Sequence, residues 1–130
     1  MAYSHQIDTS IGAVLATAEG RLGDEDLIRL AHEVSSDPLF RPEMRLLCDW
    51  VRVTTCEVTQ VGIAYEVANA RFLESARRAY VVRHGPETQV VAYLTVYSSP
   101  AESLNIRTFH VRSEALAWLN EGMPEDRRIS

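Results

Sequence analysis

Lysine is missing from this chain, and all 13 of its basic residues are arginine. A catalytic Schiff base and a phosphate-binding P-loop both need a lysine, so the sequence excludes both chemistries. Cysteine is scarce as well, because Cys48 and Cys56 are the only two and lie eight positions apart. In an extended strand, at about 3.3 Å per residue, that spacing amounts to roughly 26 Å and excludes a disulfide between them. We expect two free thiols and a location in the reducing cytoplasm.

Long apolar runs and excess positive charge are also lacking. No apolar stretch reaches about 18 residues and no N-terminal signal region occurs, so we expect no membrane insertion. The 13 basic residues face 18 acidic ones, giving a net charge of -5. Nucleic-acid binding needs a positive field, so we expect no nucleic-acid partner.

Metal-binding spacing is absent too. The four histidines, His5, His32, His84 and His110, fall in four different segments without an HxH or HxxxH pattern. We therefore expect no metal and no cofactor. Asp49 stands inside an otherwise apolar run and has two interpretations, a hydrogen-bonded structural carboxylate or a catalytic acid.

What is present is the composition of one ordinary globular domain, with 130 residues, 46% apolar and 24% charged. Alternating and continuous apolar patterns predict strands over 3–9, 13–19, 44–53, 79–83 and 106–111. Helical spacing predicts helices over 24–34, 58–74, 87–97 and 113–119, with a strand as the alternative for 87–97. We therefore predict a single α/β domain over 1–122 and a polar tail over 123–130.

The order of these elements predicts a mostly parallel five-stranded sheet with an antiparallel first strand and about four helices covering both faces. We expect the second and third helices on one face, and the first and last helices on the other. Ligands of such sheets bind beyond the carboxyl ends of the strands. The candidate ligand or anion site there comprises Arg21, Thr54, Thr55, Arg83 and His84.

The second predicted helix has two apolar stripes, although a surface helix needs only one. We expect the stripe with Val61 and Tyr65 to face the sheet, which turns the other stripe outward. The candidate dimer interface consists of that outward stripe and neighbouring residues of the third helix: Ile63, Val67, Ala70, Val91 and Val96. A ligand groove and packing within one monomer are the alternatives.

Three stretches carry a resemblance to a known family. They are the hairpin leading to Gly20-Arg21-Leu22, the run Asp37-Pro38-Leu39-Phe40-Arg41-Pro42 before Leu46-Leu47-Cys48-Asp49, and the ending from Phe109 to Leu119. Over roughly residues 3–120 the chain resembles the SpoIIAA-like, STAS-type domains of bacteria, which are similar in fold to CRAL-TRIO lipid-binding domains.

That resemblance implies a non-enzymatic protein-interaction module of unassigned role, which we expect to form a homodimer. The alternative is a binder of a small apolar or amphipathic ligand, as the likeness to CRAL-TRIO domains implies. The family's phosphorylated Ser stands in an Asp-Ser-Ser-Gly-like stretch. This chain has Val53-Thr54-Thr55-Cys56-Glu57 there instead, so we expect no phosphorylation switch at either threonine.

Overall fold

The computed structural model describes residues 2–83 and 85–130. The described elements are β1 (Ala2–Asp8), β2 (Ala13–Gly23), α1 (Asp24–Ser36), β3 (Arg45–Glu57), α2 (Gln60–Asn69), β4 (Arg78–Val81), α3 (Pro86–Tyr97), α4 (Pro100–Ser103), β5 (Ile106–Phe109), α5 (Arg112–Leu119) and a short 3-10 helix (Glu125–Arg127). The five strands form one sheet in the order β1-β2-β3-β4-β5. β1 is antiparallel to β2 and the others run parallel, which confirms the predicted α/β class.

Local sequence signals explain where the helices begin. Three acidic residues occupy the first turn of α1, where the helix dipole favours negative charge. Pro86 stands in the first turn of α3, and the prediction of a helix over 87–97 is confirmed, whereas the strand alternative is wrong. α4 is an additional short helix that was not predicted, and Ser99 caps it by accepting a hydrogen bond from the Glu102 N–H at 3.1 Å.

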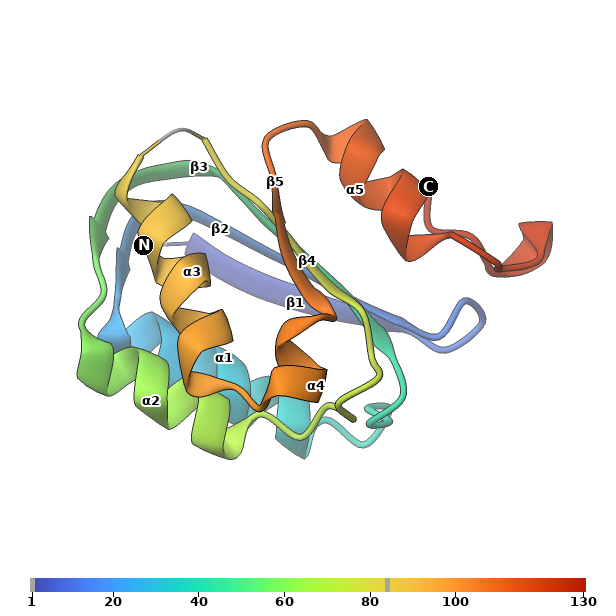
Figure 1. The fold of residues 1–130 in the computed structure, drawn as a ribbon, viewed down its shortest axis with the longest axis horizontal. Helices are drawn as coiled ribbons and strands as arrows, with labels where there is room; N and C mark the ends of the chain where they lie inside the picture. The colour runs from blue at the N-terminus through green and yellow to red at the C-terminus, as the bar shows by residue number, and fades with distance from the viewer. Residues whose placement is uncertain (1, 84) are drawn as a thin grey trace.

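The expected distribution of helices over the two faces is wrong for α1. The apolar residues of α1, α2 and α3 share one core on the inner face of the sheet. Figure 1 shows these three helices on one side and α5, near the C-terminus, on the other. The reason is the sequential strand order: each right-handed crossover advances the sheet in the same direction, so each places its helix on the same face.

The outer face is covered only in part, by α5 and the end of the chain. Ala115, Trp118 and Leu119 of α5 pack with Ile129 against the outer-facing residues Ala13, Leu47, Ala79 and Val81. The ring of Trp118 also lies between two arginines, with the guanidinium carbons of Arg77 and Arg107 at 5.1 and 4.8 Å from its centre. The predicted polar tail is thus attached to the domain through Ile129, which is buried.

Arg45 holds the end of α5 and the C-terminal segment in place through hydrogen bonds. Its buried guanidinium donates to the carbonyl oxygens of Leu119 at 3.2 Å and Arg127 at 2.7 Å, and to that of Ile11. It also donates to the side-chain oxygen of Asn120 at 3.1 Å. One side chain at the start of β3 therefore holds the loop before β2, the end of α5 and the C-terminal segment together.

Two strands are longer than predicted. β2 continues to Gly23 and β3 to Glu57, so the predicted ends of these strands at residues 19 and 53 are both wrong. The two strands pair along this extension, with Arg21 opposite Thr55 and Gly23 opposite Glu57. Glycines at positions 20 and 23 favour a loop. The two strands nevertheless continue, because their backbone N–H and C=O groups gain hydrogen-bond partners by pairing with each other.

The predicted orientation of α2 is also wrong. Ile63 is 2% exposed in the inner core and Val67 packs against that core, whereas Val61 is 78% exposed. The stripe expected to face outward faces the sheet. Close packing of α2 on α1 decides the orientation, because Gly62 brings the helix against Asp24 and leaves no room for a larger residue on that side.

Candidate functional site

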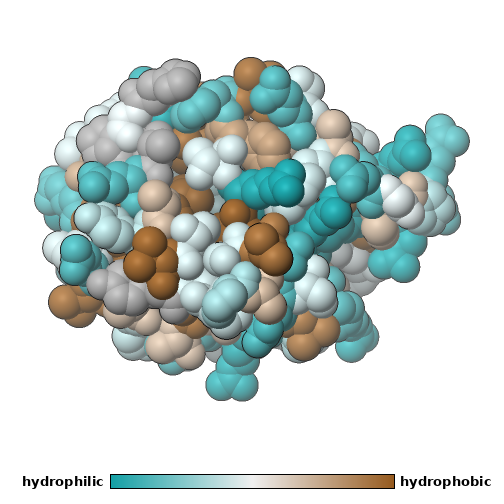
Figure 2. Space-filling view, in the orientation of Figure 1, coloured by the Kyte–Doolittle hydropathy of each residue, from teal (hydrophilic) through white to brown (hydrophobic). Residues whose placement is uncertain are grey.

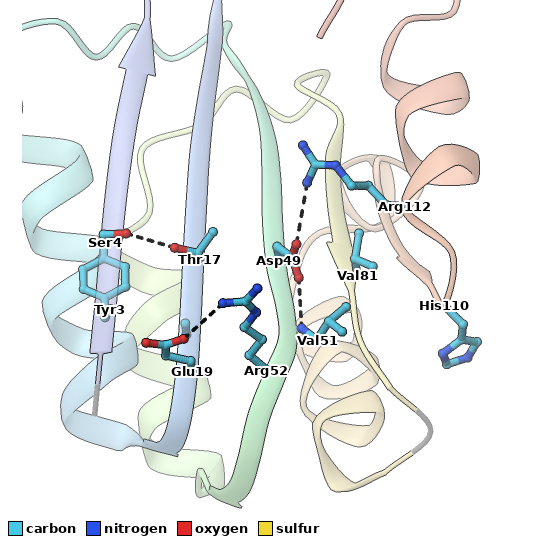
Figure 3. A pocket seen from close by; sticks show the side chains of 11 residues that line it. Tyr3, Ser4, Thr17, Glu19, Asp49, Val51, Arg52, Val81, His110 and Arg112 are labelled. Atoms are coloured by element: carbon cyan, nitrogen blue, oxygen red, sulfur yellow. Dashed lines mark hydrogen bonds and ion pairs between the residues drawn. The ribbon is translucent and has the colours of Figure 1, made fainter. Parts of the chain in front are cut away.

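A groove lies on the outer face of the sheet, over the half that α5 leaves uncovered. Its volume is about 660 Å³. We call it the outer groove, and define it by its lining residues: Tyr3, Ser4, Thr17, Ala18, Glu19, Asp49, Val51, Arg52, Val81, His110 and Arg112. Figure 3 shows the groove between β1 on one side and the start of α5 on the other. It lies over the middle of β2 and β3 and at the carboxyl end of β4.

The outward-facing positions change character along the strands. Ala13 of β2 and Leu47 of β3 are buried under α5. Two residues beyond Leu15 in β2 and Leu47 in β3, the outward-facing side chains are Thr17 and Asp49, which pair with each other in register. The polar side chains begin where the cover of α5 ends, and this half of the sheet is therefore built to meet water or a partner.

An irregularity in β3 adds Arg52 to the outer groove. Thr17 pairs with Asp49 and Glu19 pairs with Arg52, so β3 advances three residues while β2 advances two. This is the pattern of a β-bulge, which re-aims side chains. As a result both Val51 and Arg52 line the outer groove, although strict alternation would send one of them to the inner core.

The charged side chains of the outer groove form two loose ion pairs. Arg52 Nη1 lies 3.8 Å from Glu19 Oε2, and Arg112 Nη1 lies 3.6 Å from Asp49 Oδ2. Asp49 also accepts a hydrogen bond from the Val51 N–H at 3.0 Å, which fits its interpretation as a structural carboxylate. Exposed pairs of this kind contribute about 0–1 kcal/mol each. The four charges are therefore available to a partner at little cost.

Neutral polar groups complete the outer groove. The hydroxyls of Ser4 and Thr17 lie 2.9 Å apart across β1 and β2. His110 Nδ1 lies 2.9 Å from the Val82 carbonyl oxygen, which fixes the ring at the end of β5. Arg112 donates to the Ser130 carbonyl oxygen at 3.4 Å, so the outer groove and the C-terminal segment share one side chain.

The predicted anion site is only partly assembled. Arg21 and Thr55 are neighbours in register, but the Arg21 guanidinium is held by Glu57 through two contacts of 2.9 Å. Arg83 donates to the Val53 carbonyl oxygen, and Thr54 is exposed within β3 rather than after it. His84 lies outside the described residues.

The surroundings of Arg21 also work against an anion. A second hollow there is lined by the acidic residues Asp24, Glu25, Asp26 and Glu57 against the basic residues Arg21 and Arg29. A phosphate or carboxylate would meet net negative charge in this hollow. The anion site stays a prediction.

The residues of the candidate dimer interface are divided between the core and the surface of the monomer. Ile63 and Val91 are buried in the monomer, Val67 and Ala70 are half-buried, and Val96 is 72% exposed. Figure 2 shows hydrophobic residues as separate islands among polar ones on this side of the molecule. Ile63 and Val91 are therefore unavailable to a second copy, and packing within the monomer accounts for their apolar character.

A buried charged cluster lies on the inner side, away from the outer groove. Arg78 of β4 is buried and its Nη2 lies 2.9 Å from Glu102 Oε2 of α4. Glu66 of α2 is buried beside them. Burial, with a smaller contribution from Glu102, raises the pKa of Glu66 from 4.5 to about 7 against the opposing charge of Arg78. This cluster belongs to the packing of α2 and α4 and bears on stability.

Two further observations concern the chemistry of the described residues. Among residues 2–83 and 85–130, no group of three or more His, Cys, Asp or Glu side chains is placed to hold a metal ion. Within that same part of the chain, no helix combines the length and the apolar character needed to cross a membrane.

Comparison with known proteins supports the fold. No family model and no curated protein matches the sequence. The structure is similar to that of an uncharacterized protein from the DUF3478 family with a SpoIIAA-like fold, from Shewanella loihica PV-4. The TM-score is 0.57 at 16% sequence identity, and the match covers 90% of this chain and 93% of that one.

The structure is thus an α/β domain with a SpoIIAA-like fold, as the sequence resemblance predicted. The similar protein is itself uncharacterized, so the likeness brings no activity to this chain. Its role has to be argued from the outer groove.

Proposed function

We propose that this protein is a non-enzymatic interaction module of the bacterial cytoplasm, and that the outer groove is the surface with which it binds a partner protein. The uncovered half of the outer sheet face carries this proposal. Side chains from β1, β2, β3, β4 and the start of α5 all contribute to the outer groove, so it is broad rather than enclosed.

The composition of the outer groove suits a protein partner. Val51, at 37% exposed, supplies apolar surface in the outer groove, and Arg52 and Arg112 line the same groove. Protein interfaces combine an apolar centre with a polar rim, and arginine is enriched in them. Because the ion pairs between charged side chains of the outer groove are long, these side chains can exchange each other for the charges of another chain.

A small amphipathic ligand is the second candidate. Val51 would hold its apolar part and the two arginines its negatively charged group. The volume of about 660 Å³ falls within the range of small-molecule sites, about 300–1,000 Å³.

A photo-crosslinking amino acid in place of Val51 tests the proposal in living cells. Position 51 lies in the outer groove, and Val61 on the exposed side of α2 provides the matched control. We expect irradiation to give a protein adduct from position 51 and none from position 61. Absence of any protein adduct from position 51 would overturn the proposal, whereas a co-purified small molecule seen by native mass spectrometry would favour the second candidate.

A further inference from the structure

The charged residues of the outer groove form an ordered row across the sheet. Figure 3 shows their charged groups in the sequence Glu19, Arg52, Asp49 and Arg112, from β2 across β3 to the start of α5. The signs along this row are negative, positive, negative and positive. Two of the neighbouring pairs in the row are the ion pairs of 3.8 and 3.6 Å.

When a row with these alternating signs is placed against a second copy of itself in the reverse order, each charge faces a charge of opposite sign. The row runs obliquely over the strands (Figure 3). When two copies face each other about a two-fold axis that lies in the contact plane at right angles to the row, the order in one copy is reversed in the other. Glu19 then faces Arg112 of the second copy, and Arg52 faces Asp49 of the second copy. Each contact occurs twice, so all eight charges meet an opposite charge.

We propose that the occupant of the outer groove is a second copy of this chain, and that the two sheets pack outer face to outer face through this row. The inference rests on the proposed function and specifies its partner. The uncovered sheet half is continuous with the row, so the exposed Val51 would be enclosed by the same contact. The chain's net charge of -5 repels a second copy overall. The row, by contrast, sums to zero and allows close approach.

Two charge reversals test the geometry. Glu19→Arg places a positive charge opposite Arg112 of the second copy, and Arg112→Glu places a negative charge opposite Glu19 of the second copy. Each variant alone therefore opposes like charges at two points of the contact. When the two variants are mixed, the introduced arginine of one faces the introduced glutamate of the other, and every remaining contact is again between opposite charges.

Sedimentation and native mass spectrometry at a series of protein concentrations give the answer. We expect a wild-type dimer, a dissociation constant raised at least about tenfold in each single variant, and a heterodimer in the mixture that dissociates like the wild type. The mixture also shows that both variants fold. Val61→Glu, on the exposed side of α2, should leave the dimer unchanged.

Three results would overturn the inference: a monomeric wild type, single variants that associate like the wild type, or a mixture that fails to form the heterodimer. The proposed function can survive this failure, because a groove-specific crosslink from position 51 to a different protein would still support it. A crosslink with the mass of two copies of this chain would support both.

Discussion

Asp24 at the start of α1 reaches α2 only because residue 62 is glycine. A Cβ atom on Gly62 would lie 2.5 Å from Asp24 Cγ and 3.0 Å from Asp24 Cβ. The Asp24 carboxylate is fixed in that place by Thr59, whose N–H donates to it at 2.7 Å and whose hydroxyl donates to it as well. The contact of these two residues therefore sets how closely α1 and α2 pack.

The first prediction concerns Gly62→Ala. In an ordinary helix interior this substitution stabilises by about 1 kcal/mol. Here the added methyl group displaces the Asp24 side chain from Thr59, and we expect a net loss of about 1–3 kcal/mol in the free energy of unfolding. Chemical denaturation measures it. In an Asp24→Gly background the obstructing side-chain atoms are gone, so the same substitution should become neutral or stabilising; a stabilised single variant would contradict the packing described.

The second prediction concerns Arg45. Arg45→Met removes a buried donor from three carbonyl oxygens and the Asn120 side chain. A buried polar group without its partner costs about 1–3 kcal/mol, and we expect a total loss of at least about 3 kcal/mol in unfolding free energy. Hydrogen exchange at the Ile129 N–H, which donates to Asn120 at 2.7 Å, should accelerate. Arg128→Met, which removes one exposed bond, should change the stability by less than about 0.5 kcal/mol.

The third prediction is a pH dependence that follows from Glu66. Its pKa is about 7 in the folded protein and 4.5 as the ordinary value, so the folded state binds more protons between those pH values. Stability should therefore fall as the pH rises from about 4.5 to about 7, by an amount on the order of 3 kcal/mol. Glu66→Gln removes the ionisation, and should raise the unfolding free energy at pH 8 relative to the wild type.

Urea unfolding across this pH range provides the measurement. Glu33→Gln on the exposed side of α1 is the matched control, and its unfolding free energy should follow the wild-type pH profile. A Glu66→Gln variant that keeps the full wild-type slope would show that another group titrates in this range.

The fourth prediction separates the two thiols. Cys48 is fully buried, and burial raises the pKa of its thiol well above the usual value. Cys56 lies half-buried near the end of the same strand. A thiol reagent at pH 8 should modify one cysteine in the native protein and two after unfolding, since reaction needs an accessible thiolate. Cys48→Ser should leave the native reaction intact, and Cys56→Ser should abolish it.

The order and type of the elements could be predicted because each carries a local signal, such as the acidic first turn of α1 or the continuous apolar run of β3. The face taken by α1 could not, because it depends on the order of strands in the sheet, which no local pattern contains. The orientation of α2 depends in the same way on a contact distant in sequence, that of Gly62 with Asp24.

The outer groove shows the same limit. Asp49 could be noticed because a carboxylate interrupts an apolar strand. Thr17 and Glu19 could be noticed as well, because the outward positions of β2 become polar after Leu15. Their place in a groove follows only once it is known how much of the sheet α5 covers. Arg52 could not be placed, because the bulge that brings it to the outer face interrupts the alternation on which the interpretation depends.

The partial cover of the outer face has a consequence for synthesis of the chain. Leu47 is hidden only when Leu119 and Ile129 arrive, and Ile129 is made 82 residues later. At about 5–20 residues per second this interval lasts roughly 4 to 16 s. Once Ile106 has been made, the helix-covered side can close while the other side still shows a hydrophobic strip to chaperones and to neighbouring nascent chains. A message that stops short of α5 would make that strip permanent.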